Sequence, residues 1–142
     1  MLVSILGNVV QFSIFVLALW LGGRDERITA AALLANTLAS KLALGSNWVE
    51  PEYLVLLVDL LLFGLLIGLA LRTNRWWLLW CAAFELLIVV THVAIIVDPT
   101  VRARSYATGM IIWSYMVIFA LAFGTWQTWR GAVRRRAPQA SV

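Results

Sequence analysis

Five long apolar runs, separated by short polar or glycine-containing segments, account for almost the whole chain. They cover residues 2–21, 28–45, 53–71, 76–97 and 106–126. A helix needs about 20 apolar residues to cross the ~30 Å hydrocarbon layer of a bilayer, and each run has about that length. The pattern predicts an all-α polytopic membrane protein, a single bundle of five transmembrane helices within residues 1–129. Residues 130–142 are expected to form a basic cytoplasmic tail.

The connections between the runs are short enough to indicate where helices end. Gly22 and Gly23 predict a glycine C-cap for the first helix, followed by a charged hairpin over residues 24–27. Residues 72–75 predict a tight turn, so the third and fourth helices should be antiparallel neighbours. Residues 137–142 are expected to be a frayed tail. The short links leave no room for a domain outside the membrane.

Composition and charge support this class of protein. Hydrophobic residues make up 63% and charged residues 13% of the chain, whereas soluble domains have roughly 25% charged residues. The net charge is +4, but the basic residues lie at helix ends and do not form a patch interleaved with aromatic residues. The sequence therefore favours the lipid bilayer as a partner and excludes nucleic acid.

The arginines predict the orientation of the bundle. If all five runs span, eight arginines lie on one side and two on the other. By the positive-inside rule, the amino terminus is then outside and the carboxyl terminus cytoplasmic. A four-span model, in which residues 28–45 do not cross, would give six basic residues against five and no clear bias. Five spans are favoured. The arginine- and alanine-rich composition suggests a bacterial inner membrane.

Tryptophans cluster at the predicted cytoplasmic ends of the helices. Their amphipathic rings prefer the headgroup layer of a membrane, so these residues are expected to be interface anchors. The set comprises Trp20, Trp76, Trp77, Trp126 and Trp129.

A pair of glycines four residues apart lies in the third run. Gly64 and Gly68 form a G-x-x-x-G pattern, which lets a second helix backbone approach closely. We expect a close helix crossing here, made within the chain, with a second copy or with a partner.

Four ionisable residues lie at membrane depth: Lys41, Asp59, Glu85 and His92. A charge there costs at least ~2.5 kcal/mol on insertion scales, so these side chains should face protein or water. Counting along the helices from the tight turn places Asp59 between Glu85 and His92 in height, and nearer His92. Lys41 is the expected counter-ion of Asp59. Further polar side chains at similar levels complete a candidate network: Asn8, Gln11, Asn36 and Ser40.

This polar set has two interpretations. It is either a satisfied network of hydrogen bonds and ion pairs that fixes helix order, or an outward-open polar cavity for a small ligand, an ion or a proton. The sequence does not indicate a metal, haem or catalytic site. His92 has no second histidine for a haem or zinc site, and Cys81 is the only cysteine. No metal, cofactor or enzymatic activity is expected.

The absence of a recognisable catalytic motif shapes the expected function. The leading hypothesis is a non-enzymatic accessory or structural subunit of a larger membrane complex, which contacts lipid and other membrane subunits or copies of itself. The alternative is a small oligomeric transporter or channel-like protein that uses the polar cavity. Native mass spectrometry in mild detergent would discriminate them, because the first predicts a heterologous partner and the second a symmetric homo-oligomer.

Overall fold

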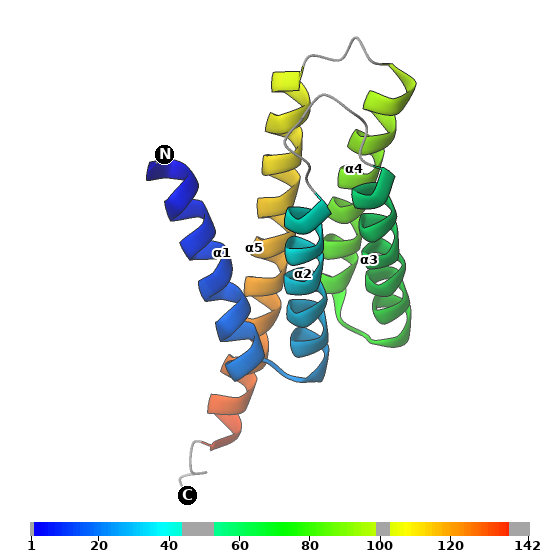
Figure 1. Cartoon of the computed structure of the whole chain (residues 1–142). Helices are drawn as coiled ribbons and strands as arrows, with labels where there is room; N and C mark the ends of the chain where they lie inside the picture. Colours follow the sequence, from blue (N-terminus) through cyan, green and yellow to red (C-terminus); the bar gives the residue numbers. More distant parts are fainter. Residues whose placement is uncertain (1, 44–52, 99–102, 137–142) are drawn as a thin grey trace, which may run out of the picture.

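The computed structural model describes residues 2–43, 53–98 and 103–136, which form five α-helices. The helices are α1 (Leu2–Leu21), α2 (Arg24–Ala43), α3 (Tyr53–Arg72), α4 (Trp76–Val97) and α5 (Ala103–Arg136). They alternate in direction along the bundle (Figure 1). The predicted all-α class and the five helices are confirmed. We call the end formed by Gly22, Gly23 and residues 73–75 the turn end of the bundle.

Three of these helices have the length and composition of membrane spans. They are α3, α4 and α5, and α1 contributes a shorter apolar stretch over Leu6–Leu21. The charged first turn and the interior polar residues of α2 keep that helix out of this group within the described residues. The protein therefore has the helices of a multi-pass membrane protein.

Helix α2 begins four residues earlier than the apolar pattern indicated. Asp25 and Glu26 lie in its first turn, where carboxylates are stabilised by the positive end of the helix dipole. Arg27 Nε donates a hydrogen bond to the Gly22 carbonyl, 3.1 Å away, and so caps the end of α1. Helix α1 ends at Leu21, directly before the two glycines that predicted its end, and no glycine in the described residues has a positive φ. Residues 44 and 45, the predicted end of this helix, lie outside the described residues.

Helix α5 continues ten residues beyond its predicted end at residue 126. Residues 130–136 contain alanine and arginine, which favour helix, and no proline stops the chain before Pro138. The last turns of α5 therefore project beyond the turn end of the bundle (Figure 1). The basic segment expected as a tail begins as a helix, and residues 137–142 lie outside the described residues.

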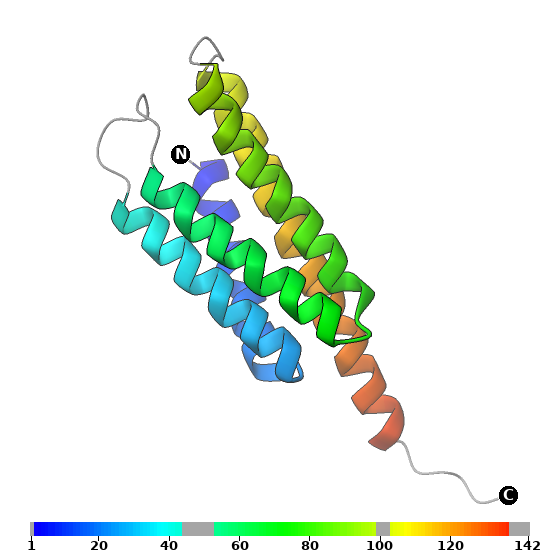
Figure 2. The same cartoon turned by 90° about the vertical axis from the view of Figure 1, so that its right-hand side faces the viewer.

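The packing divides the bundle into two parts. Helix α2 packs against α3, α3 against α4, and α4 against α5. Helix α2 also contacts α5. Among the described helices, α1 packs against α2 and α5, so it lies beside a four-helix unit (Figures 1 and 2). The interior is apolar at its centre, with buried residues from every helix. They include Phe15, Leu33, Leu66, Leu78, Val117 and Leu121.

One face of α4 supplies much of the interior. Trp77, Cys81, Glu85 and His92 are all buried, as expected for positions that repeat every three or four residues. The Cys81 thiol lies 3.7 Å from the Val117 carbonyl oxygen of α5, so the cysteine is a packed interior residue. The other faces of α3, α4 and α5 expose many leucines, isoleucines and valines. Such a surface is suited to lipid.

The neighbouring residues Trp76 and Trp77 have different environments. Trp76 is 51% exposed and packs against Phe123 with the two rings tilted, as an interface anchor can, whereas Trp77 is 1% exposed. The expectation that Trp77 is an interface anchor is wrong, because its side chain turns inward and packs on Gly124 of α5. Three other predicted anchors are exposed: Trp20, Trp126 and Trp129.

The contact between Trp77 and Gly124 gives a matched test of packing. A Cβ at position 124 would lie 2.5 Å from Trp77 Cδ2, whereas a Cβ at Gly64 would meet no atom within 4 Å. Gly124→Ala should lower the free energy of unfolding by about 1 to 3 kcal/mol, the usual cost of overpacking. Gly64→Ala should be neutral or slightly stabilising, since alanine favours helix. Thermal unfolding in detergent measures both, and equal melting temperatures would contradict the assigned packing.

The glycine pair in α3 does not form the expected close crossing within the described part of the chain. Neither Gly64 nor Gly68 has an atom of another residue near the position of an added Cβ. The reason is that α3 packs against α2 and α4 through other faces, where Val55, Asp59, Leu62 and Leu66 are buried. This glycine face of α3 is open.

Candidate functional site

Four polar side chains from four helices form a continuous chain of contacts. Asn36 Nδ2 on α2 donates to Asp59 Oδ1 on α3, at 3.0 Å. Asp59 Oδ2 lies 3.0 Å from His92 Nε2 on α4, within ion-pair distance. The other ring nitrogen, His92 Nδ1, lies 2.8 Å from the Tyr106 hydroxyl on α5. We call these four residues the polar chain.

The centre of the polar chain is buried but not fully paired. Asp59 is 3% and His92 is 5% exposed. Their facing atoms, Oδ2 and Nε2, are close, yet neither has a hydrogen-bond partner with suitable angles in the described residues. Asn36 Oδ1 also lacks a partner there. Most buried polar atoms in proteins are paired, so each exception calls for an explanation.

Glu85 adds a second buried carboxyl group on the same face of α4. It lies seven residues before His92, or about two helical turns nearer the turn end. The side chain is 1% exposed, and its Oε1 atom has no hydrogen-bond partner in the described residues. Two carboxyl groups and an imidazole thus share the interior of the four-helix unit. A purely structural network would be expected to satisfy these atoms.

Lys41 is not the counter-ion of Asp59, which corrects the sequence expectation. Its ammonium group lies 5.5 Å from the centre of the Phe12 ring on α1, in a cation–π contact, and the residue is exposed. The position nearest Asp59 on α2 belongs to Asn36, one and a half turns earlier. Counting along the helix gave a height for Lys41 but not its position around the axis of α2, and this position directs the side chain toward α1.

The remaining predicted polar residues lie apart from the polar chain. Gln11 Nε2 of α1 donates to Thr37 Oγ1 of α2 at 3.1 Å, which links these two helices. Asn8 is exposed in an open, mostly apolar groove of about 690 Å³ along α1. Ser40 is half-buried on α2. Within the described residues, the contacts among the predicted set are those of Asp59 with Asn36 and with His92.

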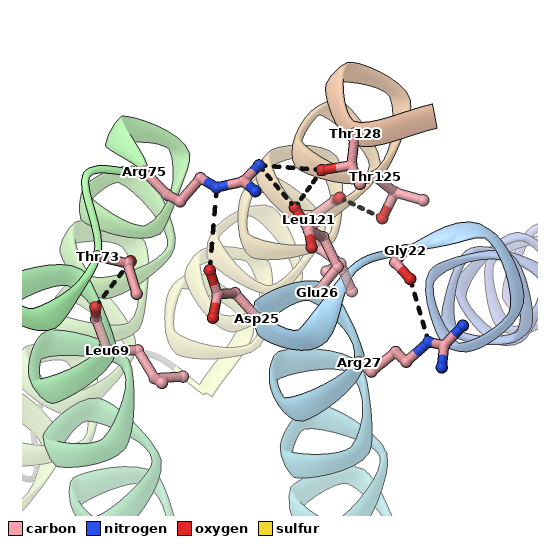
Figure 3. A network of polar contacts seen from close by, with 10 residues as sticks. All are labelled: Gly22, Asp25, Glu26, Arg27, Leu69, Thr73, Arg75, Leu121, Thr125 and Thr128. Carbon is pink, nitrogen blue, oxygen red and sulfur yellow. Dashed lines mark hydrogen bonds and ion pairs between the residues drawn. The ribbon is translucent and has the colours of Figure 1, made fainter. Parts of the chain in front are cut away.

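A second polar cluster at the turn end was not predicted. Glu26 of α2 is 0% exposed, and its Oε1 accepts a hydrogen bond from Thr128 Oγ1 of α5 at 2.7 Å. Arg75 Nη1 donates to Thr128 Oγ1 at 3.0 Å and lies 3.4 Å from Glu26 Oε1. Arg75 Nε lies 3.9 Å from Asp25 Oδ2. Figure 3 shows these side chains converging from the first turn of α2, the turn before α4 and α5, and we call them the Glu26 cluster.

The sequence contained signals for two features that were not predicted, the Glu26 cluster and the contact of Tyr106 with His92. The charged residues 24–27 and the turn at residues 72–75 were expected on the same side of the membrane, so an ion pair between them was open to prediction. Tyr106 begins the fifth apolar run, which starts at the end of the bundle where the fourth run, with His92, finishes. What the sequence did not show was the direction of each side chain around its helix, and this direction decides which residues meet.

Chemically, the polar chain can hold and pass protons. An imidazole accepts a proton at one ring nitrogen and releases one from the other, and a carboxylate and a phenol flank it here. Among the described residues, no group of three or more histidine, cysteine, aspartate or glutamate side chains is placed to hold a metal ion. Comparisons with protein-family models, curated proteins and solved structures found no match to this chain.

Proposed function

We propose that this chain is a small membrane protein that takes up and releases protons at its buried polar chain, as part of proton transport. The observation that supports the proposal is the facing pair of His92 Nε2 and Asp59 Oδ2, buried at 3.0 Å without an aligned hydrogen bond. Intramembrane ionisable residues commonly mark proton or ion pathways. The partial pairing favours this alternative over the accessory subunit that the sequence put first.

The proposed chemistry uses the order of the side chains across the four-helix unit. Tyr106 faces the side of His92 nearest α5, and Asp59 faces the side nearest α3. When His92 accepts a proton at one ring nitrogen, it can release the proton held on its other ring nitrogen to the neighbouring group. Glu85 lies about 10 Å farther toward the turn end on the same face of α4 and supplies the next protonatable group. Two further titratable residues lie beside these groups. Cys81 is four residues before Glu85 on α4, and Tyr106 on α5 contacts His92.

A flux measurement with wild-type protein tests the proposal. The purified protein is reconstituted in liposomes that contain a pH-sensitive dye, and a potassium gradient with valinomycin sets the membrane potential. We expect proton influx several-fold faster than in protein-free liposomes prepared in the same way. Flux equal to that of protein-free liposomes over a range of pH gradients would overturn the proposal.

The orientation of the protein is part of the same proposal. With five spans, the amino terminus lies outside and the turn end faces the cytoplasm of a bacterial inner membrane. A periplasm-dependent reporter enzyme fused after Arg136 should then be inactive, and one inserted between Asn47 and Glu50 should be active. Expression levels of both fusions serve as the control. The same compartment for both reporters would contradict five spans.

A second candidate function is the accessory subunit, and the open face of α3 favours it. A Cβ added at Gly64 or Gly68 would meet no atom within 4 Å in the described part of the chain, and Leu57, Leu61 and Leu65 beside them are exposed. Small residues at such positions allow another helix to pack closely. Native mass spectrometry in mild detergent separates the possibilities. A heterologous partner of fixed stoichiometry supports the accessory subunit, and a symmetric homo-oligomer supports the transporter.

A further inference from the structure

The turn end of the bundle carries a large excess of positive charge. Its exposed arginines come from three helices and include Arg24 of α2, Arg72 of α3 and Arg130, Arg134 and Arg135 of α5. The carboxylates at this end of the described residues are Asp25 and Glu26. The arginines therefore outnumber the acidic groups that can neutralise them.

Both of these carboxylates are already engaged. Arg75 lies 3.9 Å from Asp25 Oδ2 and 3.4 Å from Glu26 Oε1, and Glu26 is fully buried. Arg27 is directed to the carbonyl oxygens of Trp20 and Gly22 at the end of α1. The exposed arginines of α5 consequently have no carboxylate within the described protein, and their counter-ions must come from outside it.

The position of α5 indicates where these counter-ions lie. Trp126, Trp129 and Val133 are exposed along one side of the helix, and the guanidinium group of Arg130 lies 4.6 Å from the centre of the Trp126 ring. Exposed tryptophans mark the level of the lipid headgroups. From Trp126 to Arg135 the helix rises about 13 Å, so the arginines follow directly beyond the tryptophans, at the depth of the phosphate layer and just past it.

We propose that the end of α5 is a binding site for anionic phospholipid headgroups, with the guanidinium groups of Arg130, Arg134 and Arg135 on the phosphates. Guanidinium groups form paired hydrogen bonds with phosphate oxygens, and the tryptophan side chains pack on the adjoining acyl chains and glycerol. The proposed lipid site does not depend on which leaflet the turn end faces, and it does not depend on proton transport.

Lipid titration followed by native mass spectrometry tests the site. Wild-type protein in neutral detergent receives phosphatidylglycerol or phosphatidylcholine with the same acyl chains. We expect wild type to retain phosphatidylglycerol preferentially. The triple variant Arg130→Gln, Arg134→Gln and Arg135→Gln should bind it on the order of 100-fold more weakly, from about fivefold for each basic residue near a membrane surface.

Matched variants and competitors make the outcome decisive. The corresponding triple lysine variant keeps the charge and should retain most of the binding, and Lys41→Gln removes one positive charge elsewhere and should change nothing. Circular dichroism confirms that each variant is folded. Equal binding of the two lipids, or unchanged phosphatidylglycerol binding by the glutamine variant, would overturn the proposal. Displacement of the lipid by millimolar inorganic phosphate would show a site for a free anion instead of a lipid, and would overturn it as well.

Discussion

Replacing Asp59 with asparagine should abolish proton flux through the reconstituted protein and leave the bundle folded. Asparagine has nearly the same shape, and its side chain can still hydrogen-bond with Asn36 on α2. It carries no charge and does not titrate, so the pair with His92 no longer exchanges a proton. Dye-based flux in liposomes and the melting temperature, followed by tryptophan fluorescence, are measured on the same preparation. The melting temperature should shift by only a few degrees.

Two further variants bracket this result. Glu85→Gln, at the second buried carboxyl group, should also lower the flux, because it removes the next protonatable group along α4. Lys41→Gln removes an exposed charge that lies over Phe12 and should leave the flux unchanged. An asparagine variant at position 59 that conducts as well as wild type would show that Asp59 holds the helices together without carrying protons.

Replacing Arg75 with alanine should be the most destabilising of the surface-charge substitutions. It leaves the fully buried carboxylate of Glu26 with the Thr128 hydroxyl alone. Breaking a buried pair costs about 3 to 5 kcal/mol, and we expect the lower end of this range because the Arg75 side chain is partly exposed. Arg72→Ala is the matched control, since Arg72 is exposed and should cost less than about 0.5 kcal/mol. Thermal unfolding in detergent compares the two.

A double variant identifies the cause of the loss. If Arg75→Ala destabilises by leaving a buried charge, then adding Glu26→Gln should restore much of the lost stability, because glutamine is neutral and keeps a hydrogen-bond acceptor for Thr128. Such a cycle measures the coupling between the two residues. Equal stability of Arg75→Ala and Arg72→Ala, or further loss in the double variant, would argue against the ion pair.

Helical spacing predicted the heights of residues well. The tight turn before α4 let Asp59 and His92 be placed at similar levels by counting, and the structure brings them together. This inference needed only the rise per residue of an α-helix.

Directions around the helix axes were harder to predict. In a soluble protein the apolar stripe of a helix points to the core, but lipid is as apolar as a protein interior, so hydropathy did not show that Trp77 turns inward and Trp76 outward. Lys41 was assigned the wrong partner for the same reason. The contact of Glu26 with Thr128 joins helices that are distant in sequence, which local patterns do not encode.

The placement of the interhelical hydrogen bonds has a consequence for how the protein is made. The polar links join helices that follow one another in the chain: Gln11 with Thr37, Asn36 with Asp59, and His92 with Tyr106. Each can therefore form as soon as the later helix leaves the ribosome and enters the membrane. The bond between Glu26 and Thr128 spans 102 residues and has to wait for α5. Synthesis of α5 thus completes the contacts of the Glu26 cluster, and until then Glu26 lacks its closest partner.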